Sequence, residues 1–233
     1  MKLKLLFIIS NLQTCGVSKS ITSLLNVIDR NRYDVSLMLV SPTGIFQELL
    51  PWELRVITNP VWAALNNRLG GVQRLFASGH PFLAAGHLCR LAVSCFSKAH
   101  AARMIAAMMP ALDEEFDTIV DFNGQQLLYY MVNKLKARKK ITFFHSDYDK
   151  WPYYYRIDKK YFPRVDSIFT VSDACAQSLK RNFPCVTDKI GVLENISSKV
   201  LIEKMSEENV DDMDDTRFKL LTVGHVCENK GIF

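Results

Sequence analysis

The sequence predicts an α/β fold built on a doubly wound, mainly parallel sheet of the Rossmann-like kind. Short apolar runs, each long enough for one buried strand, alternate with helix-sized stretches in which apolar residues recur every three or four positions. Connections of that size are the ones parallel strands need, because a parallel pair requires a crossover on the order of a dozen residues.

The amino-terminal half gives the first units of this pattern. Strands are expected at residues 2–9, 34–40 and 53–58. A helix is expected at 17–28, after the loop 10–16. Residues 61–109 predict a mostly helical segment with breaks at Gly70–Gly71 and at 79–81. The Met and Phe residues of that segment are interpreted as core, with a groove facing a membrane or an acceptor as the alternative.

The pattern resumes after Pro110. Strands are expected at 117–122, 139–145, 166–172 and 189–195, and helices at 125–137, 155–162 and 173–183. The basic run 134–140 is assigned to the end of a helix, where lysines suit the negative end of the helix dipole. Polar residues close the strands, namely Asp121, Asn123, His145, Ser172 and Asn195. Because parallel strands end at one edge, these residues predict a polar crevice there.

The last part of the chain predicts a change of domain. Residues 1–206 form the Rossmann-like domain, and 207–217 read as a linker because acidic residues dominate a stretch with little apolar content. Residues 218–233 read as a buried strand that runs into a glycine-containing loop. The sequence is therefore expected to hold one complete domain and the truncated start of a second.

Composition and charge set the class of protein. With 48% hydrophobic and 23% charged residues among 233, the chain has the balance of a globular protein with a sizeable core. Residues 1–110 contain eleven Lys and Arg against four Asp and Glu, a balance of +7, whereas 111–233 carry −2. The basic half is expected to dock on an anionic membrane surface. Nucleic acid is not an expected partner, because no binding module accompanies the charge.

The six cysteines show neither a C-x-x-C pair nor zinc-type spacing, so they are predicted to be free thiols in a reducing cytoplasm, with no metal site. The apolar run 5–9 is shorter than the ~7–15 residues of a secretory signal core. No charge-free stretch approaches the ~18–20 residues needed to span a bilayer. The predicted location is cytoplasmic, with any membrane attachment peripheral and on the inner face.

Three places could carry chemistry. His145 leaves a buried strand with Asp147 and Trp151 close behind it, a combination of base, carboxylate and aromatic face that suits a sugar site. A purely structural histidine is the alternative. Gly16 precedes a helix whose first amides could bind an anion, although a glycine there can equally serve a tight turn. In 224–231, His225 and Lys230 could hold a diphosphate, or the loop is only a basic surface.

The order of these motifs resembles the amino-terminal domain of a family 4 glycosyltransferase of the GT-B fold, of the bacterial capsule and lipopolysaccharide type. The segments that carry the resemblance are 16–44, 139–148, 161–179 and 189–198, and 223–231 is similar to the start of that family's donor domain. Cys15 and His225 depart from the family pattern. Cys15 stands where a second glycine is usual, and His225 where an arginine usually binds the diphosphate.

The resemblance implies one half of a retaining glycosyltransferase that uses a nucleotide diphosphate sugar and needs neither a metal nor another cofactor. It implies an acceptor that is a glycan or a lipid-linked glycan of surface polysaccharide synthesis. His145 would be the catalytic residue, and Asp147 and Trp151 would bind the acceptor. The implied donor-binding residues are Gly16, Ser172, Asn195, His225 and Lys230.

Two other functions stay open from the sequence. The chain could be a non-catalytic module that binds an acceptor or a partner. A nucleotide-sugar epimerase is the third reading, and 16–20 and 143–148 fit it less well than they fit a transferase. Because the donor half of such a site would be missing, residues 1–233 alone are expected to transfer no sugar.

Overall fold

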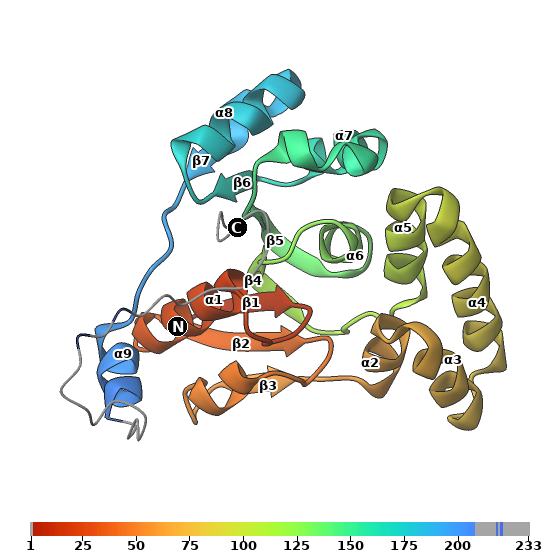
Figure 1. The fold of residues 1–233 in the computed structure, drawn as a ribbon, viewed down its shortest axis with the longest axis horizontal. Coiled ribbons are helices and arrows are strands. Elements are labelled where there is room, and N and C mark those ends of the chain that lie inside the picture. The colour runs from red at the N-terminus through yellow and green to blue at the C-terminus, as the bar shows by residue number, and fades with distance from the viewer. Residues whose placement is uncertain (1, 208–217, 219, 221–233) are drawn as a thin grey trace.

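The computed structural model describes residues 2–207, 218 and 220 (Figure 1). Its centre is a seven-stranded sheet with the strand order β3-β2-β1-β4-β5-β6-β7, in which every neighbouring pair is parallel. The strands are β1 (Leu3–Ile9), β2 (Tyr33–Leu39), β3 (Arg55–Ile57), β4 (Glu115–Asp121), β5 (Lys136–Phe144), β6 (Ser167–Thr170) and β7 (Ile190–Val192). The doubly wound prediction is confirmed. The strand order reverses direction between β1 and β4, which makes that gap the switch point of the fold.

Helices cover both faces of the sheet. The α-helices are α1 (Gly16–Val27), α2 (Pro60–Asn66), α3 (Arg68–Ala77), α4 (Pro81–Phe96), α5 (Lys98–Met108), α6 (Gln126–Lys134), α7 (Tyr155–Tyr161), α8 (Asp173–Asn182) and α9 (Lys199–Ser206). Short 3₁₀ turns lie at η1 (Ile45–Leu49), η2 (Tyr148–Lys150), η3 (Pro152–Tyr154), η4 (Phe162–Arg164) and η5 (Pro184–Lys189).

Burial on both faces explains why the strands are continuously apolar. Along β1, Leu6 and Ile8 belong to the larger core, which also holds residues of α2, α5, α6 and α8. Phe7 and Ile9 point to the opposite face, where they pack with Ile21 of α1 and with apolar residues of β2. Alternate residues of a strand face opposite sides, so a strand covered on both sides needs apolar residues at every position.

The helices α2 to α5 connect the edge strand β3 to the central strand β4 and form an arc beside the sheet (Figure 1). The break predicted at Gly70–Gly71 is wrong, because α3 runs through both glycines. A Cβ atom at Gly71 would stand 2.0 Å from the Ala64 carbonyl oxygen, so this glycine lets α3 approach α2 closely. The break predicted at 79–81 is confirmed, with Gly79 at φ +78° between α3 and α4.

The prediction that the basic run 134–140 lies at the end of a helix is wrong. The helix α6 ends at Lys134, and most of the run belongs to β5. Acidic side chains on the neighbouring strand β4 explain the difference: Lys136 lies 3.8 Å from Glu115, and Arg138 lies 3.5 Å from Asp117. Cross-strand pairs of opposite charge favour this pairing at the exposed start of the strand.

No helix of the described residues is long and apolar enough to cross a bilayer. The linker 207–217 and the strand and loop at 218–233 fall almost wholly outside the described residues, so the proposed domain boundary remains a prediction.

Candidate functional site

The polar residues that follow the strands lie at one edge of the sheet, as parallel pairing requires. At the switch point, the backbone N–H of Ser10 after β1 donates to Oδ1 of Asn123 after β4 over 3.3 Å. This bond ties together the two loops that diverge from the centre of the sheet. The candidate site is built around them.

His145 stands directly after β5 on a floor of aromatic rings. Its imidazole lies nearly parallel to the Phe143 ring at 5.6 Å and tilted over the Phe122 ring at 4.9 Å. The ring donates a hydrogen bond to the Phe122 backbone, and Nε2 is buried with no partner among the described residues. An unpartnered buried nitrogen is costly, so it marks a place where a ligand hydroxyl would be bound favourably.

Burial lowers the pKa of His145 to about 4, and the hydrogen bond with Phe122 opposes that shift only in part. The ring is therefore neutral at physiological pH. Because its other nitrogen is the donor to Phe122, Nε2 carries a lone pair and acts as an acceptor or a base. It cannot serve as a standing positive charge for a phosphate.

Asn195 lies at the same aromatic floor. It lines a cavity of about 10 Å³ together with Phe122, Phe143 and residues of α1, after the chain has crossed back from β7 toward that helix. The structure therefore gathers His145 and Asn195 around one pair of rings. The cavity is too small for a sugar, and Asn195 itself is exposed.

Gly16 is the first residue of α1, and a Cβ atom added to it would meet no atom within 4 Å. The fold itself therefore does not require glycine at this position. Cys15 and Ser172 are the N-caps of α1 and α8: Cys15 Sγ accepts from Ser18 N–H at 3.5 Å, and Ser172 Oγ accepts from Cys175 N–H at 3.3 Å. Both side chains complete helix ends, as cap residues do.

Asp147 and Trp151 belong to a different neighbourhood. The Asp147 carboxylate accepts from Asp149 N–H at 3.1 Å and caps the turn η2. The Trp151 ring contacts Tyr153 and Tyr154 with centroid distances of 6.2 and 6.3 Å. These contacts place Trp151 in a second aromatic cluster, distinct from the one beneath His145.

A buried carboxylate, absent from the sequence prediction, holds the loop after β5. Asp158 accepts hydrogen bonds from Tyr129 Oη at 2.5 Å and from Tyr148 Oη at 2.7 Å. Burial raises the pKa of Asp158 to about 6, although both hydrogen bonds lower it. Tyr148 follows His145 by three residues and is almost fully buried, so this network fixes the end of β5 relative to α6 and α7.

A second buried carboxylate shapes the loop after β4. Asp121 accepts from Thr142 Oγ1 at 2.7 Å and from the backbone N–H groups of Asn123 and Gly124 at 3.0 Å. The turn that follows has positive φ at Gly124 (+73°) and at Gln125 (+44°), the latter rare for a residue with a side chain. Such strain persists where surrounding contacts impose it.

Replacing Gln125 with glycine is expected to raise the free energy of unfolding by about 1 kcal/mol, because glycine adopts this backbone without strain. Urea denaturation measures the change. The matched control is Gln126→Gly in the first turn of α6, which is expected to destabilise the protein. Destabilisation by Gln125→Gly would show instead that the Gln125 side chain makes a contact the fold depends on.

Two adjoining pockets open beside the loops after β1 and β2. The first has a volume of about 590 Å³ and is polar, lined by Asn11, Gln13, Ser41, Pro42, Thr43, Ala63, Asn66, Asn67 and Arg74. Within it, Asn66 Nδ2 donates to Ser41 Oγ at 3.1 Å and accepts at Oδ1 from Gln126 Nε2 at 3.4 Å. Neutral amides and hydroxyls with one cation suit a polyhydroxyl ligand that carries negative charge.

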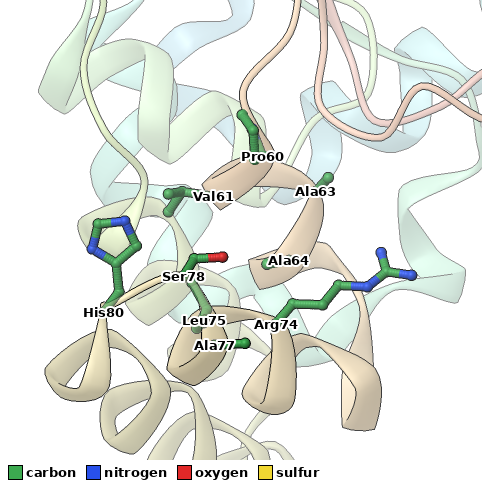
Figure 2. Close-up of a pocket in the computed structure, with 9 residues that line it drawn as sticks. All are labelled: Pro60, Val61, Ala63, Ala64, Arg74, Leu75, Ala77, Ser78 and His80. Carbon is green, nitrogen blue, oxygen red and sulfur yellow. The ribbon is translucent and has the colours of Figure 1, made fainter.

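The second pocket, of about 700 Å³, shares Ala63 and Arg74 with the first and is mainly apolar. Figure 2 shows Val61, Leu75 and the alanines between the Arg74 guanidinium on one side and the His80 ring on the other. A ligand with a polar and an apolar part could occupy the two pockets together.

The predicted donor residues His225 and Lys230 lie outside the described residues. Within residues 2–207, no group of three or more His, Cys, Asp or Glu side chains is placed to hold a metal ion. The five cysteines described there are free, namely Cys15, Cys89, Cys95, Cys175 and Cys185.

No protein-family model matches the chain, and no curated protein matches it either. Among solved structures, it is similar to Anabaena Alr3699/HepE in complex with UDP and glucose and to the same protein in complex with UDP-glucose. Both matches have a TM-score of 0.47 and 15% identity, and they cover 83% and 88% of this chain. The chain spans 44% and 49% of the HepE chains.

Proposed function

We propose that this chain is the acceptor-side half of a GT-B glycosyltransferase, which moves a sugar from a nucleotide diphosphate sugar to a glycan or lipid-linked acceptor of surface polysaccharide synthesis. The supporting observation is the buried, unpartnered Nε2 of His145 at the carboxyl edge of a parallel sheet. The motif order of the sequence supports the same proposal.

In this proposal, neutral His145 accepts a hydrogen bond from a sugar hydroxyl and orients the sugar for transfer. Its lowered pKa suits that role, because a protonated ring would have no lone pair at Nε2. Asn195, across the same rings, would close the sugar slot. The amino-terminal ends of α1 at Gly16 and of α8 at Ser172 would face the donor phosphates, with His225 and Lys230 contributing from the donor side.

We place the acceptor in the polar pocket, where the amides of Asn11, Asn66 and Asn67 would bind its hydroxyls and Arg74 a negative group. The apolar pocket beside it would take a lipid or other apolar part of the same acceptor. Asp147 and Trp151, which follow β5, are proposed as further contacts of the acceptor. Transfer would proceed with retention at the anomeric carbon and without a metal or cofactor.

A non-catalytic glycan-binding module is the second candidate, because the polar pocket is formed entirely by residues of this chain. A module that binds the acceptor without transferring a sugar would need no donor-binding residues.

The experiment uses a protein that contains this chain together with a donor-binding unit, and a panel of nucleotide diphosphate sugars. Release of nucleoside diphosphate is measured with and without a fraction of lipid-linked and free surface glycans. Release that depends on the glycan fraction is expected. Binding of glycans with no release from any donor would favour the module.

A further inference from the structure

The helix α4 exposes an apolar face and buries its charge, the reverse of a typical surface helix. Its only charged residue, Arg90, is 7% exposed, whereas Phe82 and Phe96 are each 92% exposed at opposite ends of the helix. The exposed positions form one stripe at helical spacing: Phe82, Ala85, Leu88, Cys89, Ala92, Cys95 and Phe96. We call these residues the α4 stripe. A continuous exposed apolar surface of this kind marks an interaction site.

The position of α4 leaves the stripe accessible. Figure 1 shows α4 at the outer side of the α2–α5 arc, far from the sheet. Phe76, in the neighbouring helix α3, adds another exposed aromatic side chain at 69% exposure. The stripe itself is longer than one helix turn, and no element among the described residues covers its exposed side chains.

The charge around the stripe is of one sign. From residue 54 to residue 112 the sequence contains no Asp or Glu, while it contains six Lys and Arg. Arg68, Arg74, Lys98 and Arg103 are exposed on the helices of the arc. An apolar surface on helices that carry exposed basic residues and no acidic ones is complementary to an anionic lipid bilayer, which offers phosphate groups above acyl chains.

Amphipathic aromatic residues continue the stripe at its carboxyl end. Phe96 and Tyr153 line one pocket of about 340 Å³, and Lys98 Nζ lies 4.6 Å from the centre of the Tyr153 ring. Trp151 packs against Tyr153. Tyrosine and tryptophan with a neighbouring lysine are the residues that settle at the headgroup level of membranes.

We propose that the α4 stripe is a membrane-docking surface, which inserts its apolar side chains into the interface of an anionic bilayer while the surrounding basic residues contact lipid phosphates. Self-association through the same surface is disfavoured, because two copies would bring two acid-free basic regions together. The sequence predicts docking by charge attraction and leaves a membrane-facing groove in 61–109 as an alternative to core packing. The stripe adds to charge attraction an apolar component that salt does not screen. The proposal is independent of the proposed catalytic function.

Co-sedimentation of residues 1–233 with phosphatidylglycerol-containing vesicles, across a salt series, tests the proposal. The double variant Phe82→Ser/Phe96→Ser is expected to lower the partition coefficient by about tenfold or more. Trp52→Ser is the matched control, because Trp52 is also 92% exposed but lies outside the arc, and it should leave binding unchanged. Raising salt should weaken wild-type binding without abolishing it.

A second readout uses the chain's own thiols. Cys89 and Cys95 lie on the stripe and are exposed, as is Cys185 near β7. Vesicles should protect Cys89 and Cys95 from a water-soluble maleimide and leave Cys185 reactive, which peptide mass spectrometry resolves residue by residue. Equal labelling of all three cysteines while the protein is bound to vesicles would overturn the proposal. So would a double variant that binds vesicles as strongly as wild type does. A lipid-free dimer that the double variant dissociates, with no vesicle binding, would also overturn it.

Discussion

Replacing Asp158 with alanine is expected to lower the free energy of unfolding by about 3–5 kcal/mol. The change leaves the hydroxyls of Tyr129 and Tyr148, both nearly inaccessible to solvent, without their acceptor. Each buried unsatisfied donor costs about 1–3 kcal/mol, and the lost side chain leaves a small void as well. Urea denaturation followed by circular dichroism measures the effect.

Conservative variants separate the stability that comes from the hydrogen bonds of Asp158 from the stability that comes from burying its side chain. Tyr129→Phe and Tyr148→Phe each remove one hydroxyl and keep the ring, so each is expected to cost about 1–2 kcal/mol. Asp158→Asn keeps an acceptor oxygen and should cost less than Asp158→Ala. If Asp158→Ala stays within about 1 kcal/mol of wild type, the carboxylate does not hold the loop after β5.

The raised pKa of Asp158 makes the free energy of unfolding depend on pH. The folded-state pKa of Asp158, about 6, lies above the ordinary value of 3.8, so the folded state holds its proton more tightly than the unfolded state. The stabilisation is fully present below about pH 4 and is lost as the pH rises through 6. Relative to Asp158→Asn, wild type should lose on the order of 2–3 kcal/mol across this range.

The His145→Ala variant is expected to lower sugar-transfer turnover by ~10²-fold or more, because it removes the acceptor atom proposed to orient the reacting sugar. His145→Phe is the sharper variant. It keeps a ring on Phe122 and Phe143 and lacks Nε2, which has no protein partner, but it also gives up the hydrogen bond to the Phe122 backbone, which costs about 1 kcal/mol. His145→Phe should therefore stay within about 1 kcal/mol of wild type in stability and fail in turnover.

The opposite pattern identifies a structural histidine. His145→Phe would then keep wild-type turnover, and His145→Ala would lose stability in proportion to the lost ring contacts. Thermal unfolding and initial-rate kinetics on the same preparations distinguish the two cases.

The parallel sheet could be predicted because strands buried on both faces have a sequence signature that local reading detects. The run from Leu5 to Ile9 is continuously apolar, and the structure covers it on both sides. The role of Gly71 could not be predicted from the local sequence. A glycine in a helix looks like a break unless the close approach of another helix, here at Ala64, is known.

The site could be predicted only where one residue carries the signal. His145 follows a strand directly, so its place at the edge follows from the local pattern. The bond between Asp158 and Tyr129 joins residues 29 positions apart and forms only through packing. The available signal was Asp158 itself, a charge between Ile157 and Tyr161 on the buried side of a short helix.

The apolar content of residues 61–109 favours core, with a groove facing a membrane or an acceptor as the alternative, and the core interpretation is wrong for the outer face of α4. Apolar residues lie all around this helix, so the sequence pattern does not say which side is buried. The position of its single charge on the buried side, at Arg90, depends on contacts with His87, 3.1 Å away, that no local pattern shows.

The most direct test of the proposed function is proton NMR of a transfer reaction, following the anomeric signal of the donor sugar in a protein that contains this chain and a donor-binding unit. The account predicts that the nucleotide-linked signal decays while a glycosidic anomeric signal of the same configuration grows, and that His145→Phe slows both by ~10²-fold. Equal rates for wild type and His145→Phe, or a donor signal that persists in the presence of bound acceptor, would contradict it.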